Sequence, residues 1–233
     1  MSNDLQVTIE GRDGSEQRTL HVTRVYNLGF TIRDREKMQA HLDEVEGVHV
    51  DWPPRPPIIF PISSWATITD EDVPVQYDRT SGEIEIVSVV DGDELFVGVG
   101  SDHTDRSLEA TDIPWGKQVT PNVMAPTLWR WTEVEDHWDE VLLESTIDSG
   151  EGPALYQQAG VSEFWTPREM VDATKDRIVE VPGVRVFFSG TVVSVDKELN
   201  FGHVFRMRMI DPVLGREIDH TYRVTQLADE ISE

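Results

Sequence analysis

Hydrophobic and polar residues alternate along much of this chain, which is the pattern of half-buried β-strands. In the first third of the sequence the pattern covers LQVTIEG, QRTLHVTRVYNLGF and PPIIFPISSWATI. GEIEIVSVV and DELFVGVG come next, and Asp91-Gly92-Asp93 between them predicts a tight hairpin turn. The last part of the chain adds three strand-like segments, VRVFFSGTVVSV, FGHVFRMRMIDP and REIDHTYRVTQL. We therefore expect a β-rich domain.

Two segments have the period of an amphipathic helix instead. RDREKMQAHLDEVE carries Met38, Leu42 and Val45 at helical spacing, and TPREMVDATKDRIVEV has a proline near its first turn. Many strands with two helices favour an α+β fold class.

The length of 233 residues permits one compact domain. Within it, residues 1–60 would hold the N-terminal strands, the first helix and a stiff proline-rich link. Residues 61–233 would form the main β-structure. Inside that part, the stretch IPWGKQVTPNVMAPTLWRW is predicted to be rich in loops.

Glu83 and Glu85 lie two residues apart in the first strand of the predicted hairpin. Residues two apart share one face of a strand, so both carboxylates point the same way, roughly 7 Å apart along the backbone. Asp102 and Asp105 follow in a turn after the second strand. Three hard oxygen ligands with open positions suit Mg²⁺ or Mn²⁺, with Ca²⁺ as a third candidate. The alternative interpretation is a solvated strand face in a very acidic protein.

The strongly acidic composition of the chain supports this alternative. The formal net charge is −24 and the sequence pI is about 4.5. Only four of the twenty basic residues are lysines. Such a surface is typical of a haloarchaeon-like protein from a salt-loaded cytoplasm, where high ionic strength screens self-repulsion. It also argues against nucleic acid or an anionic membrane as a partner, since both need clustered Lys and Arg.

Several classes of site and location are excluded by what the sequence lacks. It has no cysteine, which excludes disulfides, thiolate zinc sites and cysteine nucleophiles. No apolar run approaches the ~20 residues of a membrane span, and the first residues do not resemble a signal peptide. We therefore expect a cytoplasmic location.

Seven segments between about Val25 and Leu227 follow one another in a particular order: Val25–Gly29, PPRPPIIFPISSWATI, Glu83-Ile84-Glu85, Ser101–Arg106, Lys117, LESTIDSGEGPALYQQAGVSEFWTPREMV and Phe188–Thr191. In this order they resemble the motifs of the fumarylacetoacetate hydrolase superfamily, and specifically its branches of unknown function. The resemblance implies a mixed β-sandwich roll with a short helical lid, a divalent metal ion and a homodimer. The catalytic β-roll would occupy residues 61–233.

The resemblance also implies roles for individual residues. Glu83 and Glu85 match the family's Glu-x-Glu metal motif, and Asp102 falls where the third metal ligand is expected. The gap after Glu85 is shorter than is usual in the family, so Asp105 is the alternative third ligand. Substrate binding would fall to Lys117, Arg106 and Thr191.

Proton transfer is implied for a His-x-x-Glu pair in the lid. The family places this pair directly after the first strand, where this chain has Arg33-Asp34-Arg35. The nearest candidates are His41 and Glu44, which are i, i+3 neighbours on the predicted helix, and an ordinary solvated pair is the alternative. With Lys117, His103 completes the catalytic candidates, although it could equally hydrogen-bond the metal aspartates.

Taken together, these residues predict a divalent-metal-dependent hydrolase or lyase acting on a small 2-oxo acid. Such an ion acts as a Lewis acid toward the carboxylate and keto oxygens of that substrate. In the resembled family the reactions are C–C cleavage of acylpyruvates, decarboxylation, and hydration or dehydration. The alternative is a non-catalytic binding or assembly protein that keeps the fold and has lost the usual lid histidine.

Overall fold

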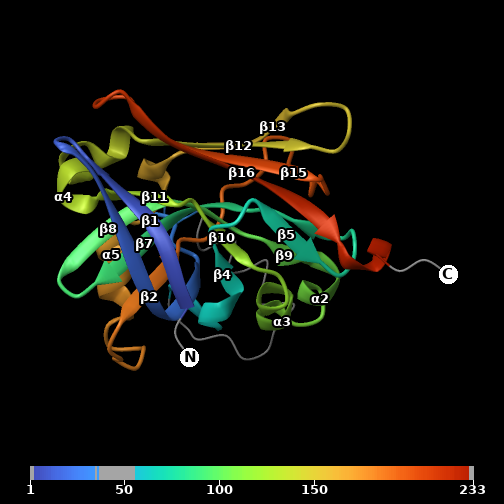
Figure 1. Cartoon of the computed structure of the whole chain (residues 1–233), viewed down its shortest axis with the longest axis horizontal. Coiled ribbons are helices and arrows are strands. Elements are labelled where there is room, and N and C mark those ends of the chain that lie inside the picture. The colour runs from blue at the N-terminus through green and yellow to red at the C-terminus, as the bar shows by residue number, and fades with distance from the viewer. Residues whose placement is uncertain (1–2, 35, 37–55, 231–233) are drawn as a thin grey trace.

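The computed structural model describes residues 3–34, 36 and 56–230. Strands dominate it, which confirms the β-rich α+β class (Figure 1). Most of the helix predicted from RDREKMQAHLDEVE, including His41 and Glu44, lies outside the described residues. Within them, no helix has both the length and the apolar character to span a membrane.

Six strands close into a ring. Their order is β11–β1–β2–β14–β7–β8, and β11 pairs with β8 as well as with β1. β3 pairs with β2, while β10 and β4 extend the sheet beyond β8. The nine strands are β1 (Asn3–Gly11), β2 (Gly14–Gly29), β3 (Ile58–Ile62), β4 (Thr67–Ile68), β7 (Ile84–Asp91), β8 (Glu94–Asp102), β10 (Asn122–Met124), β11 (Thr127–Arg130) and β14 (Val184–Phe188).

The ring is filled by apolar side chains from all six of its strands. Strand β7 shows how alternation divides them. Val87 and Val89 belong to the cluster inside the ring, whereas Ile84 and Ile86 belong to a second cluster on the other side of the strand. Because both faces are covered, β7 is buried along nearly its whole length. This is why GEIEIVSVV reads as an almost continuous apolar run after its two glutamates.

A second, five-stranded sheet covers that other side. Its order is β13–β12–β15–β16–β5, and it lies across the top of the ring in Figure 1. Phe205, Met207 and Tyr222 from this sheet share a buried cluster with Ile84 and Ile86. Its strands are β5 (Asp72–Val75), β12 (Leu142–Asp148), β13 (Ala154–Gly160), β15 (Val204–Asp211) and β16 (Arg216–Gln226). The short β6 (Thr80–Ser81) and β9 (Thr104–Asp105) pair separately.

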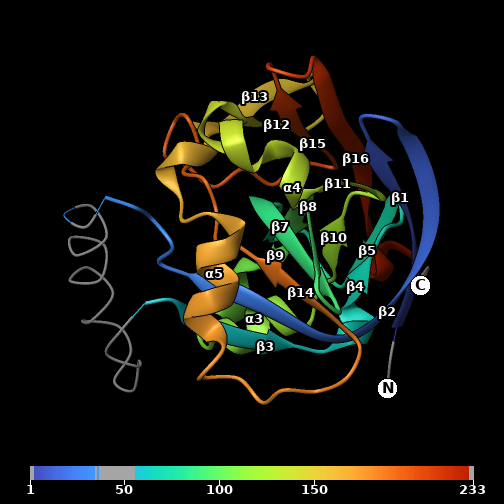
Figure 2. The same ribbon diagram turned by 90° about the vertical axis from the view of Figure 1, so that its left-hand side faces the viewer.

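The described helices are short. The α-helices are α2 (Arg106–Glu109), α3 (Ile113–Gln118), α4 (Trp131–Val134) and α5 (Pro167–Thr174). The 3₁₀ helices are η1 (Ser64–Ala66), η2 (Glu135–Glu140), η3 (Val161–Glu163) and η4 (Leu227–Glu230). Helix α5, which lies along the outside of the ring in Figure 2, confirms the predicted helix start at its proline, but the helix ends at Thr174 and does not continue to Val181 as predicted. Thr166 and Glu169 form a capping box at its start.

Two predictions about local structure were wrong. The stretch predicted as loop contains α3, because the Asp112 side chain accepts a hydrogen bond from the Trp115 N–H and Pro114 stands in the first turn. The strand predicted from VRVFFSGTVVSV ends at Phe188. Gly190 there takes a φ of 89°, which a continuing strand does not allow. The segment after Phe188 runs past the candidate site instead.

Candidate functional site

Glu83, Glu85 and Asp102 meet at the end of the β7–β8 hairpin that lies away from its turn. In the ladder Ile84 stands opposite Ser101, and the Asp102 N–H donates to the Glu83 carbonyl at 3.2 Å. This register brings one oxygen from each of the three carboxylates within 4.8 Å of the others. The predicted cluster therefore exists in the fold, and it is buried or nearly so.

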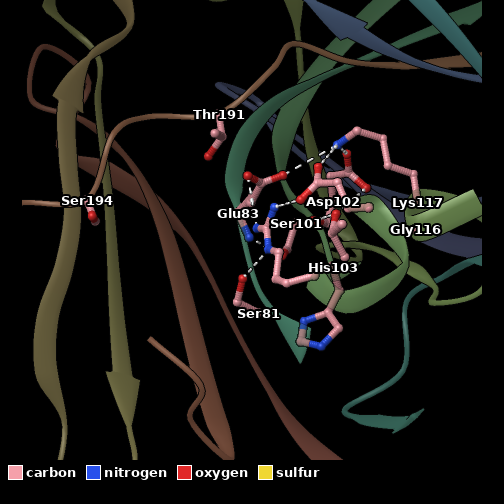
Figure 3. A network of polar contacts seen from close by, with 12 residues as sticks. Ser81, Glu83, Ser101, Asp102, His103, Gly116, Lys117, Thr191 and Ser194 are labelled. Carbon is pink, nitrogen blue, oxygen red and sulfur yellow. Dashed lines mark hydrogen bonds and ion pairs between the residues drawn. The ribbon is translucent and has the colours of Figure 1, made fainter. Parts of the chain in front are cut away.

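Two cations lie against these carboxylates, and Figure 3 shows one of them, Lys117, beside Asp102. Lys117, on α3, places its Nζ 2.5 Å from Asp102 Oδ2 and 3.5 Å from Glu83 Oε2. Arg106, at the start of α2, lies 3.0 Å from Glu83 Oε1 through Nη2 and 2.7 Å from Glu109 through Nη1. Four carboxylates thus face two cations, which leaves a formal charge of −2 when all are ionised. One divalent cation would neutralise that surplus.

Burial strongly affects the pKa values of the three carboxyl groups. It raises the pKa of the Asp102 carboxyl to about 6, although the Lys117 ammonium opposes the rise. Burial, with the nearby Asp102 and Glu83 charges, raises the pKa of Glu85 well above its usual range. Glu83 differs: burial raises its pKa, but Arg106 and Lys117 outweigh that effect and the pKa is lowered. Without another cation, the cluster therefore binds a proton most readily at Glu85.

The two cations stay charged. Burial lowers the pKa of Lys117, but the surrounding carboxylates, Asp102 first, outweigh it and raise the pKa above its ordinary value. The same balance holds for Arg106, where Glu83 and Glu109 oppose burial. A permanently charged ammonium beside the carboxylates can hold an anionic substrate group.

Asp105, the alternative third ligand, is the N-cap residue of α2. Its Oδ1 accepts hydrogen bonds from the Ser107 N–H at 2.9 Å and the Leu108 N–H at 3.0 Å, which caps α2. It does not belong to the carboxylate cluster. The structure therefore favours Asp102 over Asp105 at the candidate metal centre.

His103 points away from the carboxylates (Figure 3). Its Nδ1 lies 3.0 Å from the Tyr222 hydroxyl and its Nε2 lies 2.9 Å from Thr80 Oγ1, so both ring nitrogens are engaged. Burial lowers the pKa of this histidine to about 3, which keeps it neutral. The Tyr222 hydroxyl in turn lies 2.9 Å from Ser101 Oγ, which accepts from the Glu83 N–H. The geometry supports a structural role for His103, and the predicted part in catalysis finds no support here.

The predicted substrate-binding residues are placed unequally. Lys117 and Arg106 lie in the charge cluster. Thr191 lies above Glu83 in Figure 3. Its hydroxyl accepts a hydrogen bond from Gln157 Nε2 at 2.9 Å and donates one to the Ile84 carbonyl at 3.3 Å. Their roles toward substrate stay predictions.

Sequence reasoning missed three residues that complete the arrangement. Glu109 pairs with Arg106 at i, i+3, a spacing that could have suggested it. Gln157 and Tyr222 come from the second sheet. No local pattern marks them, because their partners lie far away in sequence.

The fold is shared with solved structures along nearly the whole chain. A 5-carboxymethyl-2-hydroxymuconate delta-isomerase from Mycobacterium smegmatis is 15% identical, with a TM-score of 0.60, and the match covers 97% of this chain and 99% of that one. A protein assigned as a fumarylacetoacetate isomerase/hydrolase from Oleispira antarctica is 14% identical, with a TM-score of 0.64, over 92% of this chain and 97% of that one. A 2-keto-3-deoxyarabinonate dehydratase is 14% identical, with a TM-score of 0.61, over 90% and 76%.

These matches confirm the fold of the fumarylacetoacetate hydrolase superfamily, which the order of motifs predicted. The sequence matches no curated protein. A family described as a protein of unknown function (DUF2848) matches residues 28–222, which is most of the chain. The chain therefore belongs to the DUF2848 family, and its fold is that of the fumarylacetoacetate hydrolase superfamily.

Proposed function

We propose that this protein is a divalent-metal-dependent enzyme that acts, as a hydrolase or lyase, on a small 2-oxo acid. One observation carries the proposal. Glu83, Glu85 and Asp102 form a compact carboxylate cluster, and with Glu109 beside Arg106 a formal surplus charge of −2 remains after Lys117 and Arg106 are counted. Burying such a surplus is costly unless a cation or protons relieve it.

The donor set fits the metal. All three candidate ligands are carboxylates, which are hard oxygen donors suited to Mg²⁺ or Mn²⁺, and Ca²⁺ is compatible with the same atoms. Bound there, such an ion would supply Lewis acidity toward the oxygen atoms of a 2-oxo acid. Glu85 has to release the proton favoured by its raised pKa before it can serve as a ligand.

The other residues prepare the site for an anion. Lys117 offers an ammonium that can hold a substrate carboxylate or stabilise negative charge as it develops. Arg106 fixes the Glu83 carboxylate by an ion pair on the side away from Lys117. His103, next to Asp102 in the sequence, turns both ring nitrogens to Tyr222 and Thr80, so proton transfer stays assigned to His41 and Glu44 as a prediction.

The activities for which the similar structures are named support the substrate class. They include an isomerase of a hydroxymuconate and a dehydratase of a 2-keto-3-deoxy sugar acid. At 14–15% identity these proteins share a fold with this chain and leave the reaction open. C–C cleavage, decarboxylation, and hydration or dehydration all remain within the proposal.

The test combines metal binding with a substrate screen. Protein stripped of metal is titrated calorimetrically with Mn²⁺ at constant KCl, and then assayed with acylpyruvates and sugar-derived 2-oxo acids. We expect one Mn²⁺ per chain and turnover of one substrate group. Asp102→Asn should lose both. The matched control is Asp93→Asn, which removes an exposed carboxylate from the turn of the same hairpin and should change neither.

The outcomes separate the candidate functions. Equal Mn²⁺ binding by the wild type and Asp102→Asn would reject the site. Mn²⁺ binding without turnover of any tested acid would favour the non-catalytic binding or assembly protein.

A further inference from the structure

Gln157 reaches from the second sheet to the strand that carries the metal candidates. It lies on β13, is only 2% exposed, and contacts Ile84, which stands between Glu83 and Glu85. We propose that Gln157 is a positioning residue of the candidate metal centre, which holds Glu85 in place through the backbone around it. This inference rests on the proposed function, because it concerns the same site.

The amide of Gln157 uses its whole hydrogen-bonding capacity. Its Oε1 accepts from the Ile84 N–H and from Ser145 Oγ, each at 3.0 Å. Its Nε2 donates to the Val192 carbonyl at 2.5 Å and to Thr191 Oγ1 at 2.9 Å. An amide has two acceptor lone pairs and two N–H donors, so every position is filled and the orientation of the group is determined.

Side-chain hydrogen bonds take the place of strand pairing along the part of β7 that β14 does not reach. β14 pairs with β7 only as far as Phe188 opposite Val87. Beyond that point the β7 N–H groups turn to side chains: the Ile84 N–H donates to Gln157, and the Ile86 N–H donates to Ser189 Oγ at 3.0 Å. Gln157 thereby joins the start of β7 to the segment after β14, which we call the 189–192 strap.

The strap acts directly on a candidate ligand. The Gly190 N–H donates to Glu85 Oε2 at 3.0 Å. Gly190 has a φ of 89°, and a Cβ there would stand 2.8 Å from the Leu28 carbonyl oxygen, so this close approach requires glycine. Gln157 holds the strap by Thr191 and Val192, and the strap in turn orients the Glu85 carboxylate. Supporting hydrogen bonds of this kind tune the affinity of a metal centre.

The experiment compares Gln157→Met with Gln158→Met in the full-length protein. Methionine keeps the length of the side chain and removes the four hydrogen bonds. Gln158 is the next residue on the same strand, is exposed, and donates to Glu144 at 3.2 Å, which makes it a matched control. Amide hydrogen exchange is followed in metal-free protein, and Mn²⁺ affinity is measured by calorimetry well below the melting temperature.

We expect Gln157→Met to accelerate exchange at least tenfold across residues 84–86 and 189–192, with β15 unchanged, and to weaken Mn²⁺ binding at least tenfold. Gln157→Glu should behave similarly, because a carboxylate accepts from Ile84 but cannot donate to the strap. Gln158→Met should match the wild type in both measurements.

Three results would overturn the inference. Unchanged exchange in the strap would show that Gln157 does not hold it. Faster exchange with wild-type Mn²⁺ affinity would leave Gln157 a purely structural residue. Failure of wild type and Gln158→Met alike to bind Mn²⁺ would reject the proposed function and, with it, a role for Gln157 at a metal centre.

Discussion

The ion pairs at the end of the β7–β8 hairpin and those on the outer face of β15 and β16 are made from the same kinds of side chain. In the outer charge ladder, Arg206 pairs with Asp219, and Arg208 pairs with Glu144 and Glu217. The side chains of Arg206 and Asp219 are 44% and 33% exposed. At the candidate site, Lys117 is 11% exposed and Asp102 only 1%.

The difference in exposure changes the chemistry. In the ladder each carboxylate has a basic partner and is partly exposed, and Arg206 lowers the pKa of Asp219. At the site, burial raises the pKa of Asp102 and Glu85 even though two cations stand beside them. An acidic composition alone does not distinguish the outer charge ladder from the candidate site. Of the two, only the candidate site has a buried surplus of negative charge.

The largest effect is expected from removing a cation. Lys117→Met should destabilise the metal-free protein by about 3 kcal/mol, because it leaves buried carboxylates without their ammonium. Arg206→Met, in the ladder, should cost less than about 1 kcal/mol because its pair is solvated. Urea unfolding at fixed KCl measures both free energies. Equal costs for the two variants would show that burial does not distinguish the two groups of ion pairs.

A second prediction concerns pH and His103. Its pKa is about 3 in the fold, whereas an unfolded chain has the ordinary histidine value of 6.5, so the unfolded protein binds the proton first. The stability contributed by neutral, buried His103 is therefore full above pH 6.5 and is lost as pH falls toward 3. Near pH 5 the loss should be about 2 kcal/mol, since each pKa unit is worth about 1.4 kcal/mol.

The matched variant for this test is His103→Gln, which keeps a donor and an acceptor between Tyr222 and Thr80. The difference in unfolding free energy between wild type and variant should shrink as pH falls from 7 to 5. A difference that does not depend on pH would mean that the folded protein accepts the proton on His103 as readily as the unfolded chain.

A third prediction tests the metal candidates directly. Glu83→Gln or Glu85→Gln should weaken Mn²⁺ binding at least tenfold while the fold survives, because each removes one anionic ligand. In the metal-free protein Glu85→Gln should not destabilise, because the neutral amide resembles the protonated carboxyl that the raised pKa of Glu85 favours. Calorimetry on these variants beside Asp219→Asn from the ladder gives the comparison. Wild-type affinity in both site variants would remove these residues from the metal centre.

The smallest effect concerns association. We propose a homodimer, which the superfamily resemblance implies, and each chain carries a formal charge of −24. Mutual repulsion between such chains is screened by salt, so association should strengthen between low and molar KCl. Light scattering gives the mass at each salt concentration. The mass of a single chain under both conditions would contradict the dimer.

Local rules predicted a large share of the fold. The hairpin that carries Glu83 and Glu85 follows from alternation and from Asp91-Gly92-Asp93, and both depend only on neighbours in the chain. The same local rules did not predict the end of β14 at Phe188. VFFSGTVVSV has a strong strand pattern, yet Gly190 leaves the strand to reach Glu85. No sequence pattern within a few residues of Gly190 predicts its hydrogen bond to Glu85.

The sequence by itself determined that Glu83 and Glu85 share a face, since the two-residue period of a strand needs no tertiary contact. Only the tertiary structure decided which aspartate joins them. Asp105 caps the short helix α2, while the ladder register places Asp102 beside Glu83. It also decided that Lys117 stands against Asp102 and that the carboxylates keep a surplus charge. The physical reason is that charge balance and desolvation depend on groups far apart in sequence, which meet only when both sheets are packed.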